Sequence, residues 1–294
     1  MGERLGSADE VRAVLASVDY LADEAIASVV FLADRLDKPV LVEGPAGTGK
    51  TELAKSVAAM SGARLIRLQC YEGLDEAKAL YEWNYRKQLL RIQAESTTEG
   101  NRRSWSDVEG DIFSEEFLLP RPLLEAIRAD EPVVLLVDEV DRLEVETEAL
   151  LLEVLSDWQV SVPELGTVRA ARIPLVFLTS NNTRDLSEAL KRRCLYLHVD
   201  YPDAERERAI VTAKVPGIGE HLADQVARVV RSVRQLDLTK PPSVSETLDW
   251  ARTLMLLNID VVDAETAAAT LHVLLKNRAD IDRAARELRT AESG

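Results

Sequence analysis

Cysteine and histidine are scarce in this sequence of 294 residues, which contains two cysteines and three histidines. Cys70 and Cys194 have neither the spacing of a zinc site nor the number needed for a disulfide framework. No apolar run approaches the length that spans a bilayer, and the N-terminus shows no signal-peptide core. We therefore expect a cytoplasmic protein with free thiols, no metal cluster and no membrane segment.

Basic residues are also in short supply, because 36 lysines and arginines face 51 aspartates and glutamates. A nucleic-acid-binding protein needs a basic face that neutralises phosphates. The basic clusters at residues 102–103 and 191–193 are short and form no stripe with interleaved aromatics. We therefore disfavour nucleic acid as the partner. The length allows one large domain or two smaller ones, each with its own core.

A glycine-rich octapeptide follows the first expected strand, residues 39–42. It reads G-x-x-x-x-G-K-T and consists of Gly44, Pro45, Ala46, Gly47, Thr48, Gly49, Lys50 and Thr51. A helix is predicted at residues 52–60, so backbone N–H groups of the loop can converge on phosphate oxygens at its N-terminus. Lys50 can reach the β- and γ-phosphates, and the Thr51 hydroxyl can bind Mg²⁺. The segment predicts a nucleoside triphosphate site rather than a simple strand-to-helix turn.

Two acidic residues end another fully apolar strand, predicted at residues 133–137. Asp138 would hold Mg²⁺, usually through water, and Glu139 would polarise the water that attacks the γ-phosphate. Acidic residues also gather at helix N-termini, so this pattern alone is weak. Its position downstream of the glycine loop favours the catalytic interpretation.

Three further polar residues are candidates for the same chemistry. Asn181 follows the next buried strand, residues 174–179, and could orient the attacking water, although asparagine is also a common turn residue. Arg192 and Arg193 end the following helix, where cations also complement the helix dipole. We expect one of them, Arg193 ahead of Arg192, to act as an arginine finger on the γ-phosphate of a neighbouring subunit.

The chain divides into an α/β part and a helical part. Strands alternate with helices over residues 1–200, which predicts a three-layer core with a mainly parallel sheet and an irregular insertion at about 70–120. Residues 201–294 show only helical periodicity and form a predicted small helical domain, in which Ser243 and Glu246 make a capping box. A hairpin is expected at residues 159–169.

Residues 95–104, within the insertion, are polar and are expected to form a loop. Trp83, Tyr85 and Trp105 flank this loop, and we expect these aromatics to pack the insertion onto the core rather than to bind a ligand.

Together these parts resemble the AAA+ ATPases, a class of P-loop NTPases. The resemblance covers nearly the whole chain, with residues 1–200 as the ATPase core and 201–294 as the all-helical lid. Walker A corresponds to Gly44–Thr51, Walker B to Val133–Glu139, sensor 1 to Asn181 and the finger to Arg193. Some stretches are similar to the MoxR group, nearest to its subgroup accessory to carbon monoxide dehydrogenase and related molybdenum hydroxylases. These stretches are residues 68–75, 117–124 and 190–195.

One family feature is missing at its usual place. AAA+ lids commonly supply a sensor 2 arginine early in a lid helix, but here the comparable residues are Ser243, Val244, Ser245 and Glu246. Arg252 lies two turns further on, at the wrong spacing for a direct match. The adenine contacts of the family come from near the N-terminal helices, which suggests residues around Asp19, Tyr20 and Val29.

The resemblance implies an ATPase that uses ATP and Mg²⁺ and works as a homo-oligomeric, hexameric ring. It further implies a chaperone-like role in maturation of, or cofactor insertion into, a metalloenzyme client, with a partner that carries a von Willebrand factor A domain. A DNA-transacting motor subunit and a nucleotide-gated scaffold with little turnover are the alternatives. A kinase is the weakest, because nothing resembles an acceptor-binding lid.

Overall fold

A five-stranded parallel sheet forms the centre of the molecule in the computed structural model, which describes residues 6–96 and 112–292. The strands run in the order β2-β5-β8-β1-β9, and every neighbouring pair is parallel. Their bounds are β1 Val40–Glu43, β2 Arg64–Gln69, β5 Val133–Asp138, β8 Leu175–Ser180 and β9 Leu195–His198. All six residues of β5 are buried, as expected for a strand covered on both faces.

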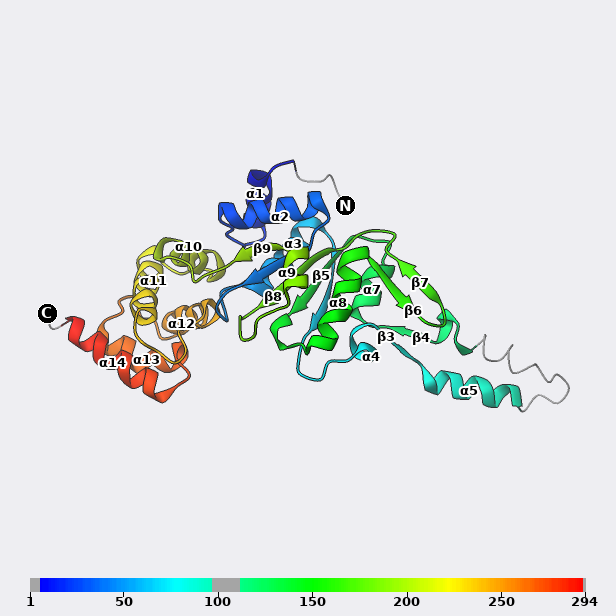
Figure 1. Ribbon diagram of the computed structural model, residues 1–294. Coiled ribbons are helices and arrows are strands. Elements are labelled where there is room, and N and C mark those ends of the chain that lie inside the picture. Colours follow the sequence, from blue (N-terminus) through cyan, green and yellow to red (C-terminus); the bar gives the residue numbers. More distant parts are fainter. Residues whose placement is uncertain (1–5, 97–111, 293–294) are drawn as a thin grey trace.

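Helices cover both faces of this sheet, which confirms the predicted three-layer core (Figure 1). Val134 and Leu136 of β5 belong to one apolar cluster, whereas Leu135 and Val137 belong to the other, because alternate strand residues point to opposite faces. The first cluster contains residues of α1 Ala8–Ser17, α2 Glu24–Leu36 and α3 Lys50–Ser61. The second contains residues of α7 Pro122–Arg128, α8 Val145–Asp157 and α9 Glu188–Arg193.

The irregular stretch at 70–120 carries a small antiparallel pair and a helix that extends away from the sheet (Figure 1). Its elements are α4 Glu76–Ala79, β3 Tyr81–Trp83, α5 Tyr85–Ser96, the 3₁₀ helix η1 Glu115–Phe117 and β4 Leu118–Pro120. Trp83 is buried and packs edge-on against Tyr81 and Phe113, as predicted for an aromatic that anchors this segment. Tyr85 is 60% exposed, so the same prediction was wrong there. Trp105 lies outside the described residues, as does most of the polar loop expected at 95–104.

The predicted hairpin is present as β6 Gln159–Val162 and β7 Gly166–Arg169, paired antiparallel. A 3₁₀ turn, η2 Val140–Arg142, follows β5 directly. Among the described residues, no helix is both long and apolar enough to cross a membrane.

Residues 199–292, all of which the structure describes, contain five helices that share an apolar core of their own (Figure 1). They are α10 Ala204–Lys214, α11 Glu220–Arg234, α12 Val244–Leu256, α13 Ala264–Leu274 and α14 Arg278–Glu292. Trp250 is fully buried, and its indole N–H donates to Thr270 Oγ1 at 2.8 Å. The capping box of Ser243 and Glu246 is confirmed at the start of α12. That residues 201–294 form a domain distinct from 1–200 stays a prediction.

Candidate nucleotide site

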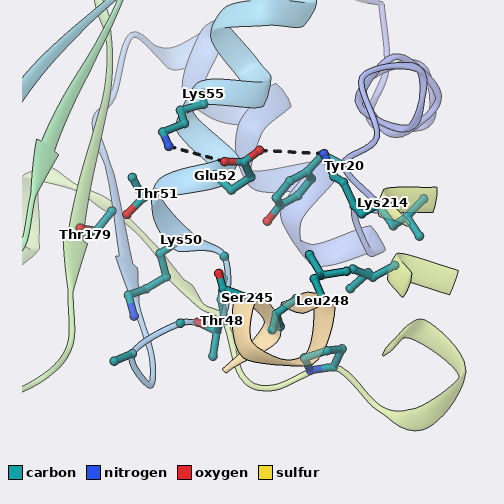
Figure 2. Close-up of a pocket in the computed structure, with 18 of the residues that line it drawn as sticks. Tyr20, Thr48, Lys50, Thr51, Glu52, Lys55, Thr179, Lys214, Ser245 and Leu248 are labelled. Carbon is teal, nitrogen blue, oxygen red and sulfur yellow. Dashed lines mark ion pairs between the residues drawn. The ribbon is translucent and has the colours of Figure 1, made fainter. Parts of the chain in front are cut away.

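A cavity of about 530 Å³ opens where the carboxyl ends of β1, β5 and β8 meet the helices that follow the sheet. Parallel strands bring their ends to one edge, so residues far apart in sequence line this space. The sheet side contributes Ala46–Thr51, Asp138, Glu139, Thr179 and Asn181. The helical side contributes Arg206, Ile210, Lys214, Val244, Ser245, Leu248 and Arg252. Figure 2 shows Lys50 and Thr51 at one end, with Ser245 and Leu248 beside the loop and Tyr20 and Lys214 at the far end.

Two glycines of the loop are required by close backbone approaches. A Cβ atom on Gly44 would lie 2.0 Å from the Val199 carbonyl oxygen, after the end of β9. A Cβ on Gly47, where φ is +78°, would lie 2.2 Å from Ser243 Cβ at the cap of α12. The Gly47 carbonyl also accepts a hydrogen bond from Val244 N–H at 3.0 Å. The phosphate loop is therefore in direct contact with the first turn of a helix outside the sheet.

Lys50 is the cation of the loop, and it is 6% exposed. Its Nζ donates to the carbonyl oxygens of Gly44 and Pro45, both at 2.7 Å. Burial lowers the pKa of Lys50, and nearby carboxylates, Asp141 first, oppose that shift. A buried cation that is hydrogen-bonded to carbonyl oxygens of its own loop can exchange them for phosphate oxygens.

Asp138 ends β5 and is 3% exposed. Its Oδ1 accepts from Thr51 Oγ1 at 2.9 Å and from Thr179 Oγ1 at 2.5 Å. Its Oδ2 accepts from Arg67 of β2, at 3.1 Å from Nε and 2.5 Å from Nη2. The structure thus joins Thr51 and Asp138, the two predicted magnesium ligands, through one hydrogen bond. Hydroxyl and carboxylate oxygens are the donors that Mg²⁺ prefers, so this pair fits the ion.

Glu139 has a left-handed backbone conformation with φ of +58°, which is unfavourable for a residue with a side chain. Its N–H donates to Thr179 Oγ1 at 2.9 Å, which fixes the turn. Its carboxylate accepts from Gln69 Nε2 at 3.3 Å and pairs with Arg142 at 3.1 Å. The turn leaves Glu139 among the residues that line the cavity, where a carboxylate can polarise water.

Asn181 also lines the cavity, at the end of β8. Its loop is held by Asp141, which is 3% exposed and accepts from Asn181 N at 3.2 Å, Thr183 N at 3.0 Å and Thr183 Oγ1 at 2.6 Å. Burial would raise the pKa of Asp141, but these hydrogen bonds outweigh it and keep the pKa below its usual value. Asp141 and Thr179 were missed by sequence reasoning. The sequence does offer a signal for each: Asp141 is an acid shortly after Walker B, and Thr179 is a hydroxyl residue in an otherwise apolar strand.

Arg192 and Arg193 are absent from the lining of this cavity. Arg193 donates through Nε to Ser156 Oγ and through Nη1 to the Ala189 carbonyl at 2.9 Å. The structure therefore brings Lys50, Thr51, Asp138, Glu139 and Asn181 together, and does not bring the two predicted finger arginines to them within one chain.

The helical side presents one face of α12 to the cavity. Val244, Ser245, Leu248 and Arg252 have the spacing of residues that share a helix face. Ser245 occupies the first turn, whereas Arg252 lies about 10 Å further along the axis at 1.5 Å per residue. Arg252 donates to Asp249 at 3.1 Å and to the Lys214 carbonyl at 3.4 Å. Arg252 is thus at the cavity, but away from the loop end where Val244 meets Gly47.

The far end of the cavity is formed by the loop between α1 and α2. Asp19 and Tyr20 line it, as the base-contact prediction expected, together with Leu21, whereas Val29 does not. Val29 lies on α2 and packs, partly buried, against the apolar cluster that contains residues of α1, α2 and α3. Arg206 of α10 fixes this loop, since it donates to the Leu21 carbonyl at 2.9 and 3.2 Å. Burial raises the pKa of Tyr20, so its phenol stays protonated and offers a ligand an O–H donor and an apolar ring.

Comparison with known proteins agrees with this geometry. The profile of the AAA domain (dynein-related subfamily) matches residues 39–194, which is more than half of the chain. An uncharacterised protein of Staphylococcus haemolyticus is 25% identical over 84% of this chain and 87% of its own length. The gas vesicle ATPase GvpN of Ancylobacter aquaticus is 29% identical over 76% of this chain and 62% of its own length.

A solved structure with the same fold is that of a mutant Thermotoga maritima RuvB, with a TM-score of 0.50 and 17% identity. The alignment covers 92% of this chain and 73% of the other, so the fold likeness extends over the helices that follow the sheet. The profile match contains both the glycine loop and the acidic strand end of the cavity. The chain therefore belongs to the AAA family of ATPases, in its dynein-related subfamily.

Proposed function

We propose that this ATPase drives the maturation of a metalloenzyme client, or cofactor insertion into it, as a ring-forming chaperone of the MoxR type. The observation that carries the mechanical part is the contact between the phosphate loop and α12, where Val244 N–H donates to Gly47 O at 3.0 Å. A nucleotide that reshapes this loop must also disturb the first turn of α12. Hydrolysis would then move the proposed lid, residues 201–294, against the core.

ATP is the proposed nucleotide, with its phosphates on the loop and its base near Asp19 and Tyr20. Thr51 and Asp138 would hold Mg²⁺, which supplies positive charge to the β- and γ-phosphates when it is bound. Lys50 leaves the Gly44 and Pro45 carbonyls for the phosphates. Glu139 polarises the attacking water, and Asn181 orients it.

Assembly supplies the missing cation. Arg193 lies outside the cavity of its own chain, so we propose that it reaches the γ-phosphate of a neighbouring subunit in a hexameric ring. Arg192, the second candidate, could do so in its place. The AAA fold and the helices after the sheet support ring assembly. The partners that we propose are a von Willebrand factor A domain protein and a metalloenzyme.

Glu139→Gln tests the hydrolytic assignment. The variant should keep ATP binding and lose phosphate release by about 10²-fold or more, because the general base is removed while the phosphate contacts remain. Glu144→Gln is the control, since Glu144 is an exposed acid five residues away, at the start of α8. Equal phosphate release from wild type and Glu139→Gln would reject hydrolysis and favour the scaffold.

Mixing two inactive variants tests the ring. Arg193→Ala keeps Glu139 but lacks the finger, whereas Glu139→Gln keeps the finger. In a mixed ring, sites that pair the first variant's Glu139 with the second variant's Arg193 should regain phosphate release. Arg192→Ala mixed in the same way shows which of the two arginines acts. No recovery with either arginine variant would contradict a shared site.

The client assignment needs a separate experiment. The Glu139→Gln variant, loaded with ATP, is used as bait in a pull-down from the cells that make this protein. It should retain the von Willebrand factor A domain protein together with cofactor-free metalloenzyme. GvpN, a gas vesicle ATPase by name, is the relative that supports an assembly role in general. Stimulation of turnover by DNA, falling steeply with salt, would instead favour the DNA motor.

The scaffold is the second candidate, and Ser245 is the observation that favours it. The first turn of α12, which lies beside the phosphate loop, offers a serine where the family usually supplies an arginine. A lid without that cation can bind nucleotide and still couple weakly to its hydrolysis. Phosphate release per subunit decides between the two.

A further inference from the structure

The carboxylate of Asp138 is already saturated with protein donors. Oδ1 accepts from the hydroxyls of Thr51 and Thr179, and Oδ2 accepts from Nε and Nη2 of Arg67. An ionised carboxylate has about four lone-pair positions, so none is left for a further donor. Asp138 is 3% exposed while these partners are in place, so the carboxylate depends on them for its hydrogen bonds.

Arg67 differs from the other donors in its charge and its exposure. Its side chain is 47% exposed, on the edge strand β2, and is not part of the cavity lining. It reaches Asp138 because β2 pairs with β5, which sets Gln69 opposite Asp138 and Arg67 two residues earlier on the same face. Arg67 also donates to Gln69 Oε1. The guanidinium is therefore free to move into solvent without disturbing a packed core.

A metal ion at Thr51 needs the same carboxylate. The Thr51 hydroxyl can bind a cation through its oxygen and still donate its proton to Oδ1, so that contact is compatible with an ion. The Arg67 contact is not, because its two N–H groups occupy Oδ2 and because it would keep a second positive charge on the carboxylate that would hold the ion.

We propose that Arg67 competes with Mg²⁺ for Asp138 and thereby sets the Mg²⁺ concentration at which magnesium-dependent nucleotide binding is half-maximal. This inference rests on the proposed magnesium site at Thr51 and Asp138. Arg67 is a positioning residue in this scheme, since it acts through Asp138 and is not part of the cavity lining. Its release is the step that readies the carboxylate for the ion.

Arg67→Gln is the test, with binding of a fluorescent ADP analogue as the readout so that turnover plays no part. Half-saturating Mg²⁺ should fall about three- to tenfold, because one competing charge near a partly exposed carboxylate is removed. Affinity in EDTA should be unchanged. Arg67→Lys keeps a charge and should stay closer to wild type. Mn²⁺ titration in the presence of ADP, followed by electron paramagnetic resonance, should show the same shift.

Arg64→Gln is the matched control. Arg64 lies on the same strand with a 51% exposed side chain, but it pairs with Glu125 and Glu131, away from the cavity. Its half-saturating Mg²⁺ should equal that of wild type. Thermal unfolding of each variant shows that the fold is intact.

The outcomes separate this inference from the site on which it rests. An unchanged or higher half-saturating Mg²⁺ concentration in a folded Arg67→Gln variant would overturn the competition but would leave the proposed magnesium site in place. A wild-type protein whose ADP affinity ignores Mg²⁺ altogether would overturn the magnesium site, and the inference with it. Loss of binding in EDTA would show that Arg67 holds the phosphate pocket itself, which also contradicts the proposal.

Discussion

The two walls of the cavity are built differently. On the sheet wall, Lys50 and Asp138 are each 6% exposed or less and are hydrogen-bonded to neighbouring strand and loop residues, and the buried Asp141 holds the Asn181 loop. The helical wall contributes Leu248 and the more accessible cations Lys214 and Arg252. The comparison teaches that candidate site residues on the sheet wall are held by buried hydrogen bonds, whereas the accessible side chains of the opposite wall can shift without breaking such bonds.

Among the described residues of the helical region, Arg234 and Glu207 form a buried ion pair that packs helices against each other. Arg234 of α11 pairs with Glu207 of α10 at 2.5 Å and donates to the Pro242 carbonyl at 2.9 Å. Its guanidinium also lies 4.5 Å from the ring centroid of Tyr201, whose hydroxyl donates to the Ala46 carbonyl at 3.4 Å. This pair therefore joins α10 and α11 to the segment before α12, and Tyr201 connects it to the phosphate loop.

The largest effect should come from breaking that pair. Arg234→Ala leaves the Glu207 carboxylate, 2% exposed, without its partner and should cost about 3–5 kcal/mol of unfolding free energy. Urea unfolding is the measurement. Replacing both residues with methionine should recover most of the loss, because no buried charge remains. A small cost in the single variant would show that the helical region has no rigid interior of its own.

On the sheet wall, Lys50→Met should weaken nucleotide binding about 100-fold, about 2.7 kcal/mol, since a charge-assisted contact to phosphate is lost. Titration with a fluorescent ADP analogue measures this. Lys55→Met is the control, because Lys55 lines the same cavity one turn later but is 49% exposed and pairs with Glu52. Equal losses in both variants would contradict a special role for the buried lysine.

Asp141→Asn should lower the unfolding free energy at pH 7 by about 1–2 kcal/mol, because the loop N–H groups lose a charged acceptor. The folded pKa of Asp141 is lowered below 3.8, so its contribution is present above that value and is lost as the pH falls through the folded pKa. The gap between variant and wild type should therefore narrow at pH 3. Asp185→Asn, at a 95% exposed side chain, is the control in urea unfolding at both pH values.

The smallest effect is expected on the helical wall. Arg252→Ala should raise the dissociation constant of nucleotide about threefold, since its side chain is 51% exposed and screened by solvent. Arg228→Ala, an exposed arginine on α11 that is not part of the cavity lining, should change nothing. A loss as large as that of Lys50→Met would show that the helical wall is as rigid and as essential as the sheet wall.

Much of the sheet wall could be predicted from the sequence. Strand β1 was expected at residues 39–42 and β5 at 133–137, and both are present within one residue. Lys50, Thr51, Asp138 and Glu139 were identified and do lie at one cavity. This worked because glycine spacing and an uninterrupted apolar strand are local signals that tertiary context seldom overrides.

Partners that depend on the order of strands could not be predicted. Arg67 meets Asp138 because β2 and β5 are neighbours in the sheet, which no local pattern states. The spacing of Arg252 does not match that of a sensor 2 arginine. Arg252 nevertheless lines the cavity, because one face of α12 points toward it. Val29 was expected near the base and instead packs into the core, because its helix face is set by contacts with the sheet.

The order of residues alone determined that this chain makes a strand, an anion-binding loop and a helix, with two acids at the end of a second buried strand. Those features need only backbone geometry and neighbouring residues. The fold decided which side chains saturate Asp138, which carboxylate holds the Asn181 loop, and which helix turn contacts Gly47. Such contacts join residues tens of positions apart, so they exist only after the sheet has set its strand order and the helices have packed on it.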